Sequence, residues 1–101
     1  MIKNNMRQIH PGEILKKEYL VPLGMTANTL SIYLRVPVTR VNEVLRERRG
    51  ITPNMALRLA RFLNTTPRFW LNLQTSFDLK QVEIQQGDKI VQEIYPLQVA
   101  V

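Results

Sequence analysis

The sequence contains no cysteine and only one histidine, His10, among its 101 residues. The lack of cysteine excludes a disulfide scaffold, a thiolate zinc site and a cysteine nucleophile. A single histidine leaves few ways to build a metal site or an acid–base pair, so we expect no metal, no cofactor and no enzymatic activity. The first eight residues hold no apolar signal segment, and the longest nearly apolar run, residues 19–25, is too short to cross a bilayer. We therefore expect a cytoplasmic protein.

Acidic residues are also scarce, because 14 Lys and Arg oppose 8 Asp and Glu and give a formal net charge of +6. The surplus lies in residues 1–74, with 12 basic and 4 acidic side chains, whereas residues 75–101 hold 2 basic and 4 acidic ones. Such a basic body favours nucleic acid as a partner, with an acidic membrane surface as the second candidate. The alternative is that this asymmetry is only solvated surface.

Short helices separated by breaks account for the first eighty residues. Five residues suit helix starts: Pro11, Thr26, Pro37, Thr52 and Thr66. Four suit helix ends: Pro22, Gly24, Gly50 and Asn64. Within each segment the apolar residues recur at helical spacing and share a face, for example Val41, Val44 and Leu45. The sequence therefore predicts an all-α fold of five helices, with His10 as a cap or surface residue.

The pattern is ambiguous after Lys80. A helix that continues to about residue 85 and a small strand pair across a Gly87-Asp88 turn fit the sequence equally well. The apolar residues of this tail either cover the core or contact another copy or another protein.

Residues 26–46 have the pattern of a helix-turn-helix motif. A helix capped by Thr26 is followed by the short turn at Arg35 and by a helix whose Val41 must point inward. The opposite flank of this second helix is polar and holds Thr39, Arg40, Asn42, Glu43 and Arg46. Asn suits adenine, Glu accepts from the cytosine amino group, and Arg binds guanine through two hydrogen bonds. Any surface helix can display such residues, but the cap, the turn and the basic body together favour DNA binding.

Further basic residues follow the second helix. Arg46, Arg48 and Arg49 suit contacts with DNA phosphates, and they also complement the negative end of the helix dipole. The helix start at Thr26 can likewise seat a phosphate. The candidate DNA-binding residues are therefore Thr26, Thr39, Arg40, Asn42, Glu43, Arg46, Arg48 and Arg49. We assign residues 1–79 to a helix-turn-helix domain and residues 80–101 to an extension that contacts a second copy or a partner.

Six blocks of the sequence, in this order, resemble the HigA/VapI antitoxins of the Xre group of helix-turn-helix regulators. The most specific blocks are residues 10–13, His-Pro-Gly-Glu, and residues 69–74, Phe-Trp-Leu-Asn-Leu-Gln. The other four blocks are residues 22–24, 34–37, 48–53 and 56–60. The resemblance extends from residue 7 to about residue 80.

The resemblance implies a lambda-repressor-like domain that dimerises, binds an inverted-repeat operator and represses its own operon. It also implies a protein partner, a HigB-like toxin that cleaves messenger RNA and is neutralised by direct contact. The dimer surface of relatives involves the last helix and tail, which here places Trp70, Leu73 and Phe77 at the interface.

The sequence departs from the resemblance at three positions. Ala27 stands where many Xre domains carry a phosphate-bracing Gln, and Glu43 stands where relatives are often basic. Arg35 occupies a turn position that commonly holds Gly, so the turn either avoids positive φ or is strained.

Four alternatives remain open at this point. A stand-alone repressor without a toxin shares every DNA-binding feature. A small basic ribonuclease would need clustered acid–base groups, and an RNA-binding module would need an aromatic strand platform. A purely structural adaptor would use the same motif for protein contact.

Overall fold

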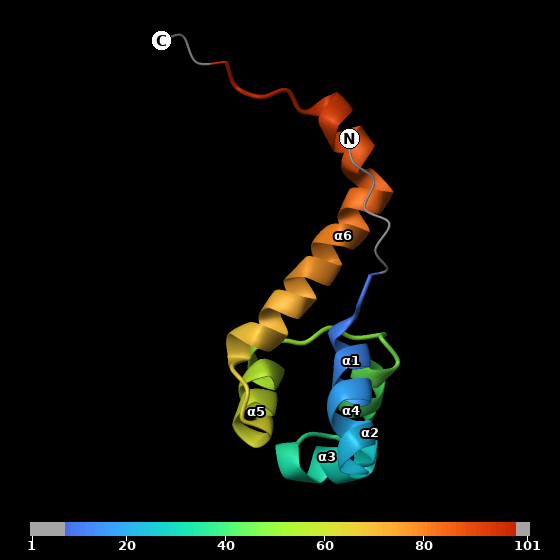
Figure 1. Cartoon of the computed structure of the whole chain (residues 1–101). Helices are drawn as coiled ribbons and strands as arrows, with labels where there is room; N and C mark the ends of the chain where they lie inside the picture. Colours follow the sequence, from blue (N-terminus) through green and yellow to red (C-terminus); the bar gives the residue numbers. More distant parts are fainter. Residues whose placement is uncertain (1–7, 99–101) are drawn as a thin grey trace.

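The computed structural model describes residues 8–98, and this part of the chain contains helices and no strand (Figure 1). The helices are α1 (Pro11–Ile14), η1 (Leu15–Leu20), α2 (Val21–Leu23), α3 (Ala27–Leu34), α4 (Val38–Leu45), α5 (Pro53–Leu63) and α6 (Pro67–Glu93). The first three follow one another without a break and form one continuous helix. Residues 8–98 thus form five helical segments, and the predicted five-helix, all-α fold is confirmed.

Side-chain caps begin four of these five segments, at the expected residues. Each capping atom accepts a hydrogen bond from a backbone N–H in the first turn and so satisfies a group that has no partner inside the helix. The pairs are His10 Nδ1 with Gly12 at 2.9 Å, Thr26 Oγ1 with Thr29 at 3.1 Å, Thr52 Oγ1 with Met55 at 3.2 Å, and Thr66 Oγ1 with Phe69 at 3.1 Å. The remaining segment, α4, follows Pro37 and has no side-chain cap.

His10 is a buried cap rather than a surface residue. Its ring packs edge-on against Phe77, with the ring centroids 4.8 Å apart. Burial lowers the pKa of His10 below its ordinary value of 6.5, against the opposing effect of the negative charges of Glu47 and Asp78. The neutral ring that burial favours is also the form whose Nδ1 can accept the capping hydrogen bond.

The first helical segment runs through Pro22, which was expected to help end it, and stops at Gly24 with φ 62°. The six residues before Val21 form a π-helical turn, in which the N–H of Val21 donates to the carbonyl of Lys16, five residues back. A proline ring ordinarily clashes with the carbonyl four residues earlier, and a widened π turn gives this ring room.

The core lies where the first segment, α3, α4 and α5 meet the start of α6. Its fully buried side chains include Trp70, Leu15, Leu30, Leu59, Val41 and Val44. The first segment packs against α4 so closely that a Cβ on Gly12 would collide with the carbonyl oxygen of Val44. This contact, rather than backbone freedom, requires glycine at position 12, and it fixes the depth of α4 in the body.

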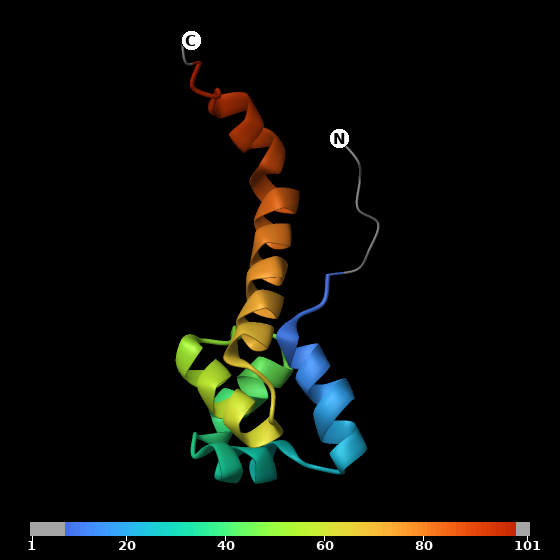
Figure 2. The ribbon, with the colours of Figure 1, turned by 60° about the vertical axis from the view of Figure 1, so that its left-hand side comes forward.

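α6 leaves the body and extends away from it, as both views show (Figures 1 and 2). Its 27 residues correspond to a length of about 40 Å. Of the two alternatives left open after Lys80, the strand pair across Gly87-Asp88 is wrong. The helix is the one observed, and it continues eight residues beyond residue 85, to Glu93. A single glycine costs a helix only about 1 kcal/mol, so the surrounding helix-forming residues decide the outcome. None of the helices between residues 8 and 98 combines the length and the apolarity that a membrane span requires.

Candidate nucleic-acid interface

α4 turns its polar flank outward. Val41 and Val44 are each only 1% exposed and anchor the opposite flank in the core. On the outer flank Thr39 is exposed, and Arg40, Asn42 and Glu43 are half-buried. Arg46 follows the helix and is exposed. The residues predicted to contact bases are therefore not sealed inside the molecule, and the flank is open to a ligand.

The turn between α3 and α4 adopts a left-handed conformation at Arg35, with φ 58° and ψ 47°. The N–H of Arg35 donates to Ile32 and that of Val36 donates to Ser31, which is the Schellman pattern of hydrogen bonds. Of the two predicted alternatives, the turn with positive φ is the one observed. A residue other than glycine in this conformation stores about 1 to 2 kcal/mol.

Arg58 supports the same turn from α5. Its Nη1 donates to the carbonyl of Leu34 at 2.8 Å, and its Nε donates to Oδ1 of Asn54 at 2.8 Å. A charged donor therefore satisfies one of the free carbonyls at the end of α3. Sequence reasoning gave Arg58 no role, because nothing in the pattern of α5 shows which carbonyl the side chain reaches.

The loop after α4 turns at Glu47 rather than at Gly50. Glu47 has φ 62°, and the N–H of Arg48 donates to the carbonyl of Glu43 at 2.8 Å. Gly24 is the only glycine with positive φ between residues 8 and 98, so Gly50 does not end the helix by backbone freedom. Instead, a Cβ on Gly50 would lie 2.9 Å from the side-chain amide of Gln74 on α6.

Glu43 forms an ion pair with Arg49, with 3.0 Å between Oε2 and Nε. The two side chains are about 43% and 46% exposed, so the pair lies at the surface. The pair orients the side chain of Arg49 toward α4, and the carboxylate of Glu43 already has a charged partner. A cytosine contact by Glu43 would therefore require it to share or exchange this partner.

A hollow of about 360 Å³ collects two of the candidate arginines beside the start of α5. Its lining consists of Arg40, Arg49, Gly50, Thr52, Asn54 and Met55. Arg46 and Arg48, which are exposed, do not line it. Sequence reasoning missed Thr52 and Asn54 as part of this basic surface, although the cap at Thr52 could have indicated that a helix start lies next to the arginine cluster.

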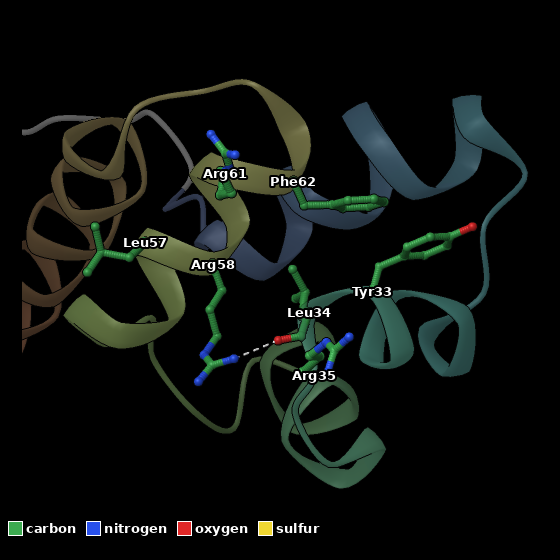
Figure 3. Close-up of a pocket in the computed structure, with 7 residues that line it drawn as sticks. All are labelled: Tyr33, Leu34, Arg35, Leu57, Arg58, Arg61 and Phe62. Atoms are coloured by element: carbon green, nitrogen blue, oxygen red, sulfur yellow. Dashed lines mark hydrogen bonds between the residues drawn. The ribbon is translucent and has the colours of Figure 1, made fainter.

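A second hollow, of about 530 Å³, lies between the end of α3 and α5 (Figure 3). Its lining consists of Tyr33, Leu34, Arg35, Leu57, Arg58, Arg61 and Phe62. The rings of Tyr33 and Phe62 stack with centroids 4.8 Å apart. None of the candidate DNA-binding residues lines this hollow.

The three residues predicted at a dimer interface have different positions. Trp70 is 0% exposed and donates from Nε1 to Thr65 Oγ1 at 2.8 Å, so its side chain belongs to the core and offers no surface to a second copy. Leu73 and Phe77 are half-buried. Seven and fourteen residues after Phe77, on the same helical face, Ile84 and Val91 are 66% and 73% exposed. This apolar face extends from the core onto the outer half of α6.

Thr26 lies at the exposed start of α3, where its cap is confirmed, and its predicted phosphate contact stays a prediction. Within residues 8–98 no group of three His, Asp or Glu side chains gathers as a metal site would require.

Comparisons with known proteins give close relatives. No protein-family profile matches the chain. Virulence-associated protein I from Dichelobacter nodosus is 48% identical over 95 residues, which cover 94% of this chain and 86% of the relative. Antitoxin HigA-1 from Vibrio cholerae is 38% identical over 80 residues, which cover 78% of this chain and 74% of the relative.

Solved structures with the same fold include two that are described with DNA. Antitoxin GraA in complex with its operator has a TM-score of 0.89 and 49% identity, over 98% of this chain and 100% of that chain. Pseudomonas aeruginosa antitoxin HigA with the higBA promoter also has a TM-score of 0.89, with 41% identity over 91% of this chain and 100% of that chain. The resemblance noted in the sequence is thus confirmed over nearly the whole chain.

Proposed function

Because the chain belongs to the HigA family of Xre-type helix-turn-helix antitoxins, we propose that it binds operator DNA through α4 and represses its own operon. One observation carries the proposal: the polar flank of α4 is open, while Val41 and Val44 hold the opposite flank in the core. A B-DNA major groove about 12 Å wide admits such a helix. The neighbouring hollow at Arg40 and Arg49 provides positive charge for the DNA backbone.

The residues of this surface divide into two roles. Thr39 and Asn42 discriminate bases, and Glu43 lies beside them on the same flank. Arg40 and Arg46 provide groove and backbone affinity. The remaining candidates, Arg48, Arg49 and the capped α3 start at Thr26, contact phosphates. This division predicts that one group sets sequence preference and the other sets salt-dependent affinity.

The operator is an inverted repeat, because a two-fold dimer presents two copies of α4 to one face of the DNA. Half-sites in such complexes lie about 34–36 Å apart. Leu73, Phe77 and the apolar face of outer α6 provide the surface for the second copy. The exposed Ile84 and Val91 support this assignment, since apolar side chains on a projecting helix gain most from burial.

The chain also neutralises a HigB-like, messenger-RNA-cleaving toxin by direct binding. Support for this step comes from family membership, since one relative is named Antitoxin HigA-1 and a solved structure is described as antitoxin HigA with the higBA promoter. Co-expression with a toxic product of the neighbouring gene tests it. Relief of toxicity and co-purification are the expected results. Toxicity that persists, with no complex, would leave a stand-alone repressor as the function.

Footprinting and a salt titration on the DNA upstream of the gene test the division of roles. Asn42→Ala should cost about 1–3 kcal/mol on the operator and little on a scrambled duplex. Arg49→Ala should weaken both duplexes alike and lower the slope of log K against log salt by about one unit. Arg61→Ala is the charge-matched control, because Arg61 is exposed and lines the other hollow. Equal behaviour of all three variants would contradict the proposal.

A further inference from the structure

Gln74 connects the start of α6 to the loop that carries Arg48 and Arg49. Its Oε1 accepts a hydrogen bond from the backbone N–H of Ile51 at 2.7 Å. Its Nε2 donates to Oδ1 of Asp78, one turn further along α6, at 2.9 Å. Both ends of the side-chain amide are therefore bonded, and its orientation is fixed.

Gly50 brings the loop into direct contact with this amide. A Cβ at position 50 would lie 2.9 Å from both Cδ and Nε2 of Gln74 and 3.0 Å from Oε1. The two distances of 2.9 Å are shorter than Cβ contacts normally are, so the amide would have to shift, and a shift would strain its two hydrogen bonds. The glycine at position 50 is thus explained by the approach of Gln74.

The two ends of the loop are held in different ways. At its start, the N–H groups of Arg48 and Arg49 donate to the carbonyl of Glu43 at 2.8 and 3.3 Å, which ties the loop to α4. At its end, the N–H of Ile51 donates to Gln74, and the side chain of Ile51 is 4% exposed in the core. Gln74 is therefore the one side chain that bonds the far end of the loop to another helix among residues 8–98.

The same loop borders the basic hollow. Gly50 lines that hollow together with Arg40 and Arg49, and it touches Gln74. The backbone that carries the exposed guanidinium groups thus rests on a side chain from α6. Loss of the amide would leave the Ile51 N–H without its acceptor. The segment between Glu47 and Ile51 would then be held by Glu43 at its start and by the buried side chain of Ile51, without the hydrogen bond at its far end.

We propose that Gln74 is a positioning residue for the DNA-backbone contacts of Arg48 and Arg49. This inference rests on the proposed DNA binding, and it assigns Gln74 a role through the loop rather than through a contact of its own with DNA. Its hydrogen bond to Ile51 holds the loop in the conformation that binds phosphates, so the loop needs no ordering when DNA arrives.

Three variants test the proposal. Gln74→Met keeps the length of the side chain and removes the acceptor. Gln74→Glu combined with Asp78→Asn keeps an oxygen that faces Ile51, keeps a donor–acceptor pair between positions 74 and 78, and leaves the net charge unchanged. Asn72→Ala, an exposed residue on the same turn of α6, is the control. Gln74→Met should weaken binding to operator and scrambled duplexes alike, about threefold to tenfold, and lower the salt slope by about one unit. The double variant Gln74→Glu with Asp78→Asn should stay within about twofold of the parent chain and keep its salt slope.

The readouts separate this role from a merely structural one. All measurements are made at a temperature where each variant is folded by circular dichroism. A Gln74→Met variant that is less stable but binds with the parent affinity and salt slope would overturn the proposal. A double variant, Gln74→Glu with Asp78→Asn, that fails to restore the parent affinity and slope would overturn it as well.

Amide hydrogen exchange in the DNA-free protein separates failure here from failure of operator binding. Faster exchange at Ile51 and Gly50 in Gln74→Met is expected, and unchanged exchange would overturn the positioning role. A parent chain that binds operator and scrambled duplexes equally would instead contradict the proposed repressor, while the slope on the scrambled duplex still tests Gln74.

Discussion

Single residues in left-handed backbone end each of the first four helical segments. Their identities are Gly24, Arg35, Glu47 and Asn64, with φ between 56° and 62°. Only the first is glycine, the residue that adopts this conformation without steric cost. Asn tolerates it better than most side chains, so strain concentrates at Arg35 and Glu47, next to the two ends of α4.

Arg35→Gly should be more stable than Arg35→Ala by about 1 kcal/mol, because both remove the side chain and only glycine removes the strain. Thermal or urea unfolding of the two variants measures the difference. Equal stabilities would show that the left-handed turn at Arg35 is not under steric strain.

His10 should make stability depend on pH. Its pKa in the folded chain lies below the ordinary 6.5, so between these two values the unfolded chain binds a proton that the folded chain does not. The free energy of unfolding is therefore highest above pH 6.5 and falls as the pH decreases through this window. Urea unfolding between pH 7.5 and 5.5 measures it. His10→Asn, which can cap without titrating, should have the shallower dependence, and parallel curves would contradict the assignment.

Helical elements were largely predictable because caps and apolar spacing are local signals. Thr26, Thr52 and Thr66 each mark a start by their own chemistry. The end of α6 was not predictable, since Gly87-Asp88 has the composition of a turn and no local signal tells that it stays helical. The sequence did not predict that the first helix continues through Pro22, because the helix tolerates this proline only through the π turn before it.

Of the candidate site, the exposure of the α4 flank followed from periodicity. The contact of Gln74 with Gly50 joins residues 24 positions apart and has no local signature.

Gly12→Ala should destabilise the fold by about 1–3 kcal/mol, although alanine is the better helix former. The added Cβ meets the carbonyl of Val44 and must push the first segment away from α4. Thermal unfolding measures the loss, and operator affinity should fall with it because α4 moves. An unchanged melting temperature would mean that the two helices do not require this close packing.

Gly87→Ala is the same substitution as Gly12→Ala in the other helix, and it should have the opposite effect on stability. A Cβ at position 87 meets nothing closer than Glu83 Cβ at 4.0 Å, so helix propensity alone should act and stabilise α6 by about 0.5–1 kcal/mol. Amide hydrogen exchange along outer α6 at low protein concentration measures this gain, because this half of the helix lies outside the cooperatively unfolding body. A loss that grows with concentration would instead show that a second helix packs against Gly87.

The whole molecule consists of a packed body and a projecting half-helix. Every fully buried apolar side chain in the described part of the chain lies at or before Trp70, whereas Ile84 and Val91 remain exposed on outer α6. A chain that ends after Leu79 should therefore keep a cooperative unfolding transition close to that of the full chain, and it should lose self-association. Sedimentation equilibrium measures the association.

The double variant Ile84→Glu with Val91→Glu should also lose self-association in the full chain, and the exposed Glu83→Ala should not. A dimer that survives both changes would place the second copy elsewhere.

The projection of α6 also gives it mechanical leverage. Gln74 lies seven residues from the start of the helix and Glu93 lies 26 residues from it, or about 10 and 39 Å along the axis. If the helix tilts as a rigid rod about its first turn, a sideways movement of about 4 Å at the tip displaces Gln74 by about 1 Å. That displacement is enough to break a hydrogen bond of 2.7 Å. A protein that binds the tip of α6 can thus weaken the DNA contacts of the loop after α4, although it lies far from the DNA groove.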